Sequence, residues 1–271
     1  MRGLINRETE KGESCSPGSG CLSPVAALVR RHDHDRFQTA LFAPAARREA
    51  LFALYAFNYE VARVRETVSE PVLGQIRLQW WRESIAAAYE DGPLRRHIVV
   101  EPLTAAIRAQ GLTRAHFDRL IDAREGDLEE ASFGSLGALE QYAEASSARL
   151  VYLALETLGV RDAAAEQAGF HIGIAYALAG LLRAMPHRAR IGRSLVPAEI
   201  AAAASRHLAS ARALRAAIAR SALPALLPAV VAERSLTRLK RAGYDPFRPA
   251  LAAPDQMQSW RLVIASLRNR F

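Results

Sequence analysis

Three side chains in one predicted helix stand where a metal-dependent diphosphate site would need its ligands. Asn58, Ala62 and Glu66 follow one another at intervals of four residues, so a helix through 55–66 would carry them on one face. A helical protein that binds a diphosphate through Mg²⁺ would supply two carboxylates at this spacing, because Mg²⁺ prefers hard oxygen ligands. Glu66 is the only carboxylate of the three, and the neighbouring Arg63 has the wrong charge for a cation. The pattern argues against a magnesium site.

A second group of charged residues, further along the chain, is entirely basic. We expect the helix that precedes it to face the first helix, and no Asp or Glu occurs between Gly169 and Glu199. Guanidinium groups bind phosphate oxygens in pairs, whereas they do not hold a magnesium ion. The group therefore predicts either a phosphate site or a solvated basic face beside a core helix. Its members are Arg183, Arg188, Arg190 and Arg193.

Other candidate ligands are isolated. Asp127, Glu129 and Glu130 form an acidic helix end that we expect to face solvent, with Asp127 as its one candidate metal ligand. His171 lies in an apolar helix, where a hydrogen-bonded core histidine is a simpler interpretation than a ligand. No local motif for Cys–His or Ser–His–Asp catalysis accompanies these residues.

Helices must position all of these side chains, since apolar residues recur at intervals of three and four almost throughout and no run of alternating β-branched residues predicts a strand. Ser23 is a candidate N-cap, with Pro24 in the first helical position. We expect a disordered leader over 1–22 and one all-α domain over 23–271, with roughly eight to ten helices. The predicted helical segments are 23–42, 45–70, 72–92, 102–111, 113–131, 135–159, 162–185, 198–219, 222–243 and 254–271.

The net charge of +8 belongs to the last third of the 271 residues. From residue 183 onward there are 16 Lys or Arg and 4 Asp or Glu, which gives +12, whereas the first 182 residues carry −4. This asymmetry implies an acidic partner, such as an anionic membrane surface or a phosphate-bearing ligand. Nucleic acid is not expected, because no recognition motif is present.

The N-terminal stretch and the cysteines bear on localisation. Cys15 and Cys21 are the only cysteines, which excludes a disulfide scaffold or a zinc cluster. The stretch has no apolar signal core, and Glu8, Glu10 and Glu13 argue against a transit peptide. No apolar run approaches the roughly 18–20 residues that span a bilayer. We expect a cytoplasmic protein that is soluble or peripherally bound at the inner membrane.

Two stretches resemble signature regions of the squalene/phytoene synthase family. The first, ALFAPAARREALFALYAFNYEVARVRE, matches the family at Pro44, Arg48, Tyr55, Ala56 and Phe57. The second is HIGIAYALAGLLRAMPHRARIGRSLVP, and between the two, Asp127 and Tyr142 match a central pair. The family's aspartates would fall at Ala62, Arg63, Glu66, Ala184 and Arg188. The resemblance implies an all-α, single-domain helical bundle of the trans-isoprenyl diphosphate synthase (terpenoid synthase) type.

Within this family, four stretches are similar to the branch formed by mitochondrial complex I assembly factor 6 and its bacterial relatives, which has likewise lost the aspartates. They are FNYEVARVRETVSEPVLGQIRLQWWRESI, YLALETLGV, the helix ending LLRAMPHRAR, and GYDPFRPALAAPDQMQSWRLVIASL. The resemblance implies a catalytically inactive assembly or chaperone factor for respiratory complex I, with no catalytic residue, metal or other cofactor. Its expected partners are complex I subunits or assembly intermediates, an anionic membrane surface, and a prenyl or acyl lipid. Candidate ligand-binding residues are Arg48, Tyr55, Asn58, Asp127, Tyr142, Arg183 and Arg193.

Two alternatives remain open at this point. One is an active prenyl transferase that condenses two prenyl diphosphates with Mg²⁺ and unusual ligands, among them Glu66. The other is a metal-free module that binds a prenyl diphosphate or lipid head group through Arg183, Arg188 and Arg193.

Overall fold

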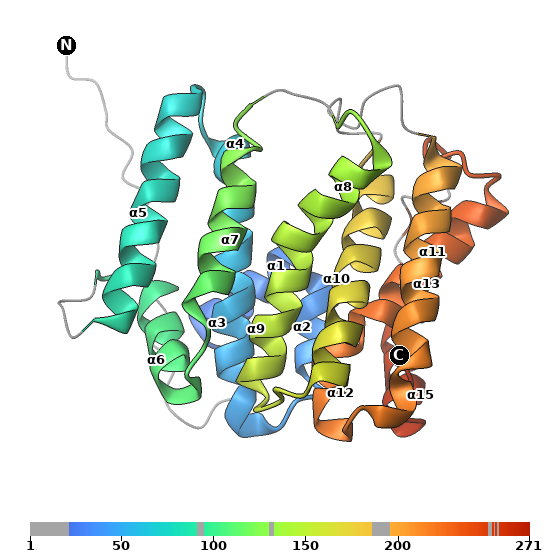
Figure 1. Cartoon of the computed structure of the whole chain (residues 1–271). Coiled ribbons are helices and arrows are strands. Elements are labelled where there is room, and N and C mark those ends of the chain that lie inside the picture. Colours follow the sequence, from blue (N-terminus) through green and yellow to red (C-terminus); the bar gives the residue numbers. More distant parts are fainter. Residues whose placement is uncertain are drawn as a thin grey trace, which may run out of the picture.

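The regular elements within the described part of the chain are all helices (Figure 1). The computed structural model describes residues 22–90, 95–129, 133–185, 196–248, 251, 253 and 255–271. The predicted all-α fold is therefore confirmed. The predicted leader lies outside the described residues except for Leu22, which packs against the core.

The N-terminal segment forms two helices where one was predicted. In α1 (Pro24–His32), the Ser23 side chain accepts a hydrogen bond from Ala26 N at 3.2 Å, as the N-cap pattern indicates. The helix stops at Asp33, whose backbone leaves the helical region and whose carboxylate accepts from Arg36 N at 3.2 Å. Asp33 thereby begins α2 (His34–Ala40) and turns the chain toward the centre of the bundle.

Helix α3 (Ala45–Ala62) lies in the centre of the N-terminal half, and the residues from Leu51 to Asn58 are all buried. It packs against α1, α6 (Val100–Gln110), α7 (Arg114–Glu125) and α9 (Arg149–Thr157). The predicted helix over 45–70 ends early. Arg63 separates α3 from the short α4 (Val64–Thr67), and α5 (Pro71–Tyr89) then begins with Pro71 in its first position and packs on α6 and α7.

A wide helical turn connects α8 (Leu136–Ala143) to α9. Residues Glu144–Ala148 form a π-helix, in which Arg149 N donates to the carbonyl of Glu144, five residues earlier. The long helix α10 (Ala163–Ala184) packs closely against this turn. Gly173 makes the approach possible, because a Cβ at this position would lie 2.3 Å from the Cα of Ala148.

The C-terminal third adds helices on the other side of α10. These are α11 (Pro197–Ala213), α12 (Leu223–Leu226), α13 (Pro228–Arg241) and α15 (Gln258–Leu267), with short 3₁₀ turns at Arg215–Ala217 and Arg220–Ala222. The long helices stand side by side, with α5 at the left edge of Figure 1 and α13 and α15 at the right. Helix α15 packs on α13, so it forms the outer layer of this end.

Candidate functional site

A cavity of about 270 Å³ lies where the C-terminal parts of α3, α7 and α10 meet the π-helix. Ala62 and Ala184, which stand in the two stretches singled out by sequence, both line it. We call it the central cavity. Its described lining residues are Arg36, Asn58, Ala62, Arg124, Tyr142, Ser146, Ser147, Tyr176, Ala177, Gly180, Leu181 and Ala184.

Arg36 is one of two charged side chains on this wall. Its Nη1 lies 2.7 Å from Asp33 Oδ2, and its guanidinium stacks 4.7 Å above the centre of the Tyr176 ring. Burial opposes the charge of Arg36, but Asp33 and the adjacent tyrosines outweigh burial, so its pKa is raised above the ordinary value. At Tyr176 burial has the opposite effect on the pKa and raises it, so the hydroxyl stays neutral. Arg36 is therefore a permanent cation against an aromatic wall.

Arg124, in the last turn of α7, is the second charged side chain. Its Nη1 donates to the Tyr142 hydroxyl at 2.6 Å and to Asp127 Oδ2 at 3.2 Å, and the same hydroxyl donates to Asp127 at 2.9 Å. The prediction that Asp127 faces solvent is wrong: it is buried, because Arg124 and Tyr142 compensate its charge. Glu129 is exposed as predicted, and Glu130 lies outside the described residues.

Buried polar atoms around the central cavity have no hydrogen-bond partner among the described residues. They are Asn58 Oδ1, Ser147 Oγ and Arg124 Nε. Buried polar groups of this kind are normally satisfied by ordered water or by a ligand. The cavity is several times the roughly 30 Å³ that one water occupies, so its size and chemistry fit a small polar ligand or head group.

Magnesium does not fit this wall. Mg²⁺ is usually held by carboxylates, and the described lining of the central cavity offers two guanidinium groups and no carboxylate. Across the described residues, no three His, Cys, Asp or Glu side chains gather into a group that could hold a metal ion.

The predicted face that joins Asn58, Ala62 and Glu66 does not form. The break at Arg63 reorients the chain, so Glu66 is exposed on α4 and is not among the described lining residues of the central cavity. Arg63 lines a different pocket and pairs with Glu60 at 3.5 Å.

Two candidate residues from the first signature stretch lie outside the central cavity. Arg48 Nε donates to the carbonyl of Ala43 at 2.9 Å, near the start of α3 and away from Ala62. Tyr55 is buried with the Arg36 guanidinium above its ring, and burial raises its pKa. Neither is among the described lining residues. Tyr55 contacts the lining residue Arg36 from behind, whereas Arg48 lies near the other end of α3.

The basic group predicted near the end of α10 is described only at Arg183. Its Nη1 lies 3.2 Å from Asp35 Oδ2, and Arg183 is not among the described lining residues of the central cavity. Arg188, Arg190 and Arg193 lie outside the described residues.

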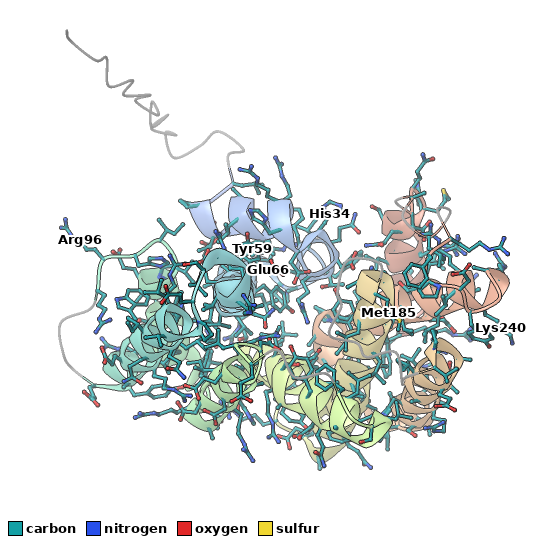
Figure 2. The ribbon with its side chains drawn as sticks, turned by 90° about the horizontal axis from the view of Figure 1, so that it is seen from above. His34, Tyr59, Glu66, Arg96, Met185 and Lys240 are labelled. Atoms are coloured by element: carbon teal, nitrogen blue, oxygen red, sulfur yellow. The ribbon has the colours of Figure 1, made fainter. Side chains whose placement is uncertain are left out.

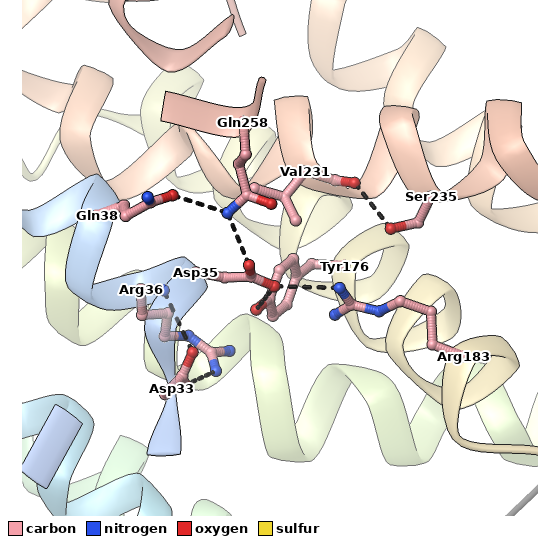
Figure 3. Close-up of polar contacts among 9 residues, drawn as sticks. All are labelled: Asp33, Asp35, Arg36, Gln38, Tyr176, Arg183, Val231, Ser235 and Gln258. Atoms are coloured by element: carbon pink, nitrogen blue, oxygen red, sulfur yellow. Dashed lines mark hydrogen bonds and ion pairs between the residues drawn. The ribbon is translucent and has the colours of Figure 1, made fainter. Parts of the chain in front are cut away.

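Asp35 joins the central cavity to a second cavity (Figure 3). Its carboxylate accepts from Tyr176 Oη at 3.3 Å, Arg183 Nη1 at 3.2 Å and Gln258 Nε2 at 2.8 Å. The second cavity, of about 300 Å³, is lined by Asp35, Arg183 and Gln258 together with residues of α13. Asp35 therefore connects three helices that are distant in sequence: α2, α10 and α15.

Sequence reasoning missed Asp35 and Arg36. Charged side chains in a predicted amphipathic helix are normally assigned to its solvent face. The one signal in the sequence was the run HDHDRF, which puts many charges into a short segment between apolar residues.

Comparisons with known proteins show which family the chain resembles. The sequence pattern of squalene/phytoene synthase matches residues 29–205. Complex I assembly factor 6 of Bos taurus is 30% identical over 303 residues, covering 98% of this chain and 90% of that protein. The Mus musculus protein of the same name is 32% identical, covering 94% and 84%. Presqualene diphosphate synthase of Rhodopseudomonas palustris is 28% identical over 158 residues, covering 58% and 56%. Among solved structures, squalene synthase HpnC from Alicyclobacillus acidocaldarius has a TM-score of 0.72 at 19% identity, covering 82% and 94%, which shows a shared fold.

Proposed function

The chain belongs to the squalene/phytoene synthase family, and from this premise we propose that it is a non-catalytic member that acts as an assembly factor for respiratory complex I. The observation that carries the proposal is the extent of similarity. The relatives named complex I assembly factor 6 align with 90–98% of the chain, whereas the presqualene diphosphate synthase aligns with 58%.

The chemistry of the central cavity supports the loss of catalysis. A prenyl diphosphate ionises only when the charge on its leaving diphosphate is neutralised, and bound metal ions supply much of that stabilisation in such reactions. Ala62 and Ala184 carry no ligand for a metal. Arg36 and Arg124 are already paired with Asp33 and Asp127, which reduces what they can offer a leaving group. We therefore propose that the protein uses no metal cofactor.

The expected place of action is the inner face of the cytoplasmic membrane, where the client would be a complex I subunit or assembly intermediate. None of the described helices combines the length and apolar character needed to cross a membrane. Attachment would rest on the basic last third, because anionic lipid attracts each nearby Lys or Arg by roughly 1 kcal/mol.

Deletion of the gene tests the assembly role. We expect complex I activity to fall and to return when the wild-type gene is restored, with the isoprenoid profile of the same strain unchanged. Normal complex I activity together with altered isoprenoids would refute the proposal and favour the prenyl transferase. As an independent measurement, purified protein with Mg²⁺ and farnesyl diphosphate should release no diphosphate at enzymatic rates.

A second function, a metal-free module for an anionic ligand, is favoured by the unpartnered Asn58 Oδ1 and Ser147 Oγ beside two guanidinium groups. It predicts calorimetric binding of farnesyl diphosphate in the presence of a chelator. Ala184→Leu should abolish this binding by filling the central cavity. Ala46→Leu, on the exposed start of α3, is the matched control and should bind normally. Binding that survives Ala184→Leu would contradict this second function.

A further inference from the structure

Helix α15 presents an apolar stripe to solvent. Met257, Trp260, Ile264 and Leu267 expose between 47% and 72% of their surface, whereas Leu262 and Ala265 of the same helix are buried. The spacing of four and three residues places Trp260, Ile264 and Leu267 within about 60° of one another around the helix, and Met257 directly precedes its first turn. Large apolar side chains that gather on one exposed helix face mark an interaction surface.

The border of this stripe is basic. Arg261 lies three residues before Ile264 and Arg268 lies four residues after it, so each is one helical turn from the stripe. Both are exposed, and so is Arg270 just beyond the helix. Asp255, the one acidic residue of the described segment 255–271, is mostly buried and lies 3.0 Å from Arg234 and 3.5 Å from Arg261. The surface beside the apolar stripe is therefore positively charged.

A different apolar patch, on α5, has the opposite surroundings. Val72, Leu73 and Ile76 are exposed there. The adjoining groove between α5 and α7 is lined by Asp122, Glu125 and Glu129, together with Arg65. The patch on α5 therefore borders an acidic groove, whereas the stripe on α15 has a basic border.

We propose that α15 lies on an anionic lipid bilayer, with its stripe inserted at the headgroup level and its arginines against lipid phosphates. The inference rests on the peripheral membrane location in the proposed function, and it assigns that attachment to one helix face. Interfacial helices combine an apolar face that contains Trp with basic flanks, and they insert only about 5–10 Å into the bilayer. The stripe offers a few hundred Å², below the roughly 800 Å² that each partner contributes to a stable protein interface.

The rest of the structure holds α15 in this orientation. Gln258 donates to Asp35 at 2.8 Å, and Gln38 donates to Ser259 Oγ at 2.7 Å, so the start of the helix is fixed to α2 (Figure 3 shows Gln38, Asp35 and Gln258). A helix that is already ordered loses less conformational entropy when it docks.

Vesicle binding by the full-length purified protein tests the proposal. We expect sedimentation with vesicles of phosphatidylcholine and phosphatidylglycerol, and little with phosphatidylcholine alone. The anionic vesicles should also shift tryptophan emission to the blue. Trp260 would cause this shift, since Trp81 is buried and Trp80 is half-buried against it in α5. Brominated lipid should quench the same emission.

Two variants and two matched controls localise the binding. Trp260→Ser and Arg268→Glu should each weaken partitioning into anionic vesicles about tenfold or more, because one removes apolar area and the other reverses a charge. Ile76→Ser and Arg96→Glu make comparable changes elsewhere on the surface and should bind as wild type does. Figure 2 shows Arg96 at the opposite end of the molecule from Lys240, the last-turn lysine of α13 that shares the basic end with α15.

The outcomes separate this inference from the proposed function. A wild-type protein that binds neither kind of vesicle, or a Trp260→Ser variant that binds as tightly as wild type, overturns the membrane surface and leaves the assembly role standing. Equal loss of binding in the Ile76→Ser control also overturns it. Normal complex I activity in the deletion strain refutes the assembly role whatever the vesicles show.

Discussion

Replacing Gly173 by alanine tests the close packing of α10 on the π-helix. A Cβ on Gly173 would lie 2.3 Å from Ala148 Cα and 2.6 Å from Ala148 N, so it meets backbone atoms of the π-helix. Backbone cannot rotate away as a side chain does, and α10 must move off the π-helix to accept the methyl group. Gly180, in the same helix, is a matched control, because a Cβ on Gly180 would meet no atom of the described residues within 4 Å.

Two opposing effects set the expected magnitude. Alanine in a helix interior is more favourable than glycine by about 1 kcal/mol, and this gain applies equally at both positions. Overpacking against a well-packed core costs about 1–3 kcal/mol, and more where backbone must shift. Because backbone atoms must shift, we take the upper end of this cost, about 3 kcal/mol, so after the gain is subtracted Gly173→Ala should lower the free energy of unfolding by about 2 kcal/mol. Gly180→Ala should raise it by up to about 1 kcal/mol.

Urea unfolding followed by circular dichroism measures both variants, and the comparison of midpoints at equal slopes gives the difference in stability. Gly169→Ala should fall between the two, because its Cβ would meet the ends of the Leu155 and Val151 side chains at 3.1 Å. If Gly173→Ala is as stable as Gly180→Ala, the close packing of α10 on the π-helix is refuted.

Two further predictions concern buried titratable groups. Glu156 accepts from Thr113 N at 2.8 Å at the start of α7, so Glu156→Ala should cost about 1–3 kcal/mol in urea unfolding. Glu101 is exposed in the first turn of α6, so Glu101→Ala should cost less than about 1 kcal/mol, and equal midpoints for the two variants would contradict the role of Glu156. His171 and His207 contact each other through their Nδ1 atoms at 2.9 Å, and burial lowers the pKa of both below the ordinary 6.5. The unfolded chain then binds more protons, so the free energy of unfolding should decrease as the pH falls from 6.5 through the lowered pKa values. His171→Gln should make the free energy of unfolding depend less on pH. Parallel pH profiles for variant and wild type would refute this prediction.

The helices were predictable from sequence because their signals are local. Apolar spacing located most of the long helices, and Ser23 with Pro24 marked the start of α1. The breaks at Asp33 and Arg63 were not predicted, since both interrupt stretches whose apolar spacing continues across them. At Asp33 the carboxylate caps the next helix, and Asp is a residue type that is common at helix N-caps.

The candidate site was predictable only in part. The resemblance to the family located Ala62 and Ala184, and the structure brings both to one cavity. Arg36 and Arg124 were missed, because burial of a charge depends on a compensating partner in three dimensions. Asp33 and Asp127 provide that compensation, and neither pairing has a recognisable sequence pattern.

The Asp35 carboxylate has a thermodynamic consequence for the two ends of the molecule. It accepts hydrogen bonds from Tyr176, on the wall of the central cavity, and from Gln258, at the start of α15. A ligand that displaces the Tyr176 hydroxyl changes the environment of a group that anchors α15. If occupancy of the cavity alters the affinity of α15 for its surface by some factor, docking of α15 must alter ligand affinity by the same factor. One carboxylate is thus placed to make filling of the cavity and attachment of the helix a single linked equilibrium.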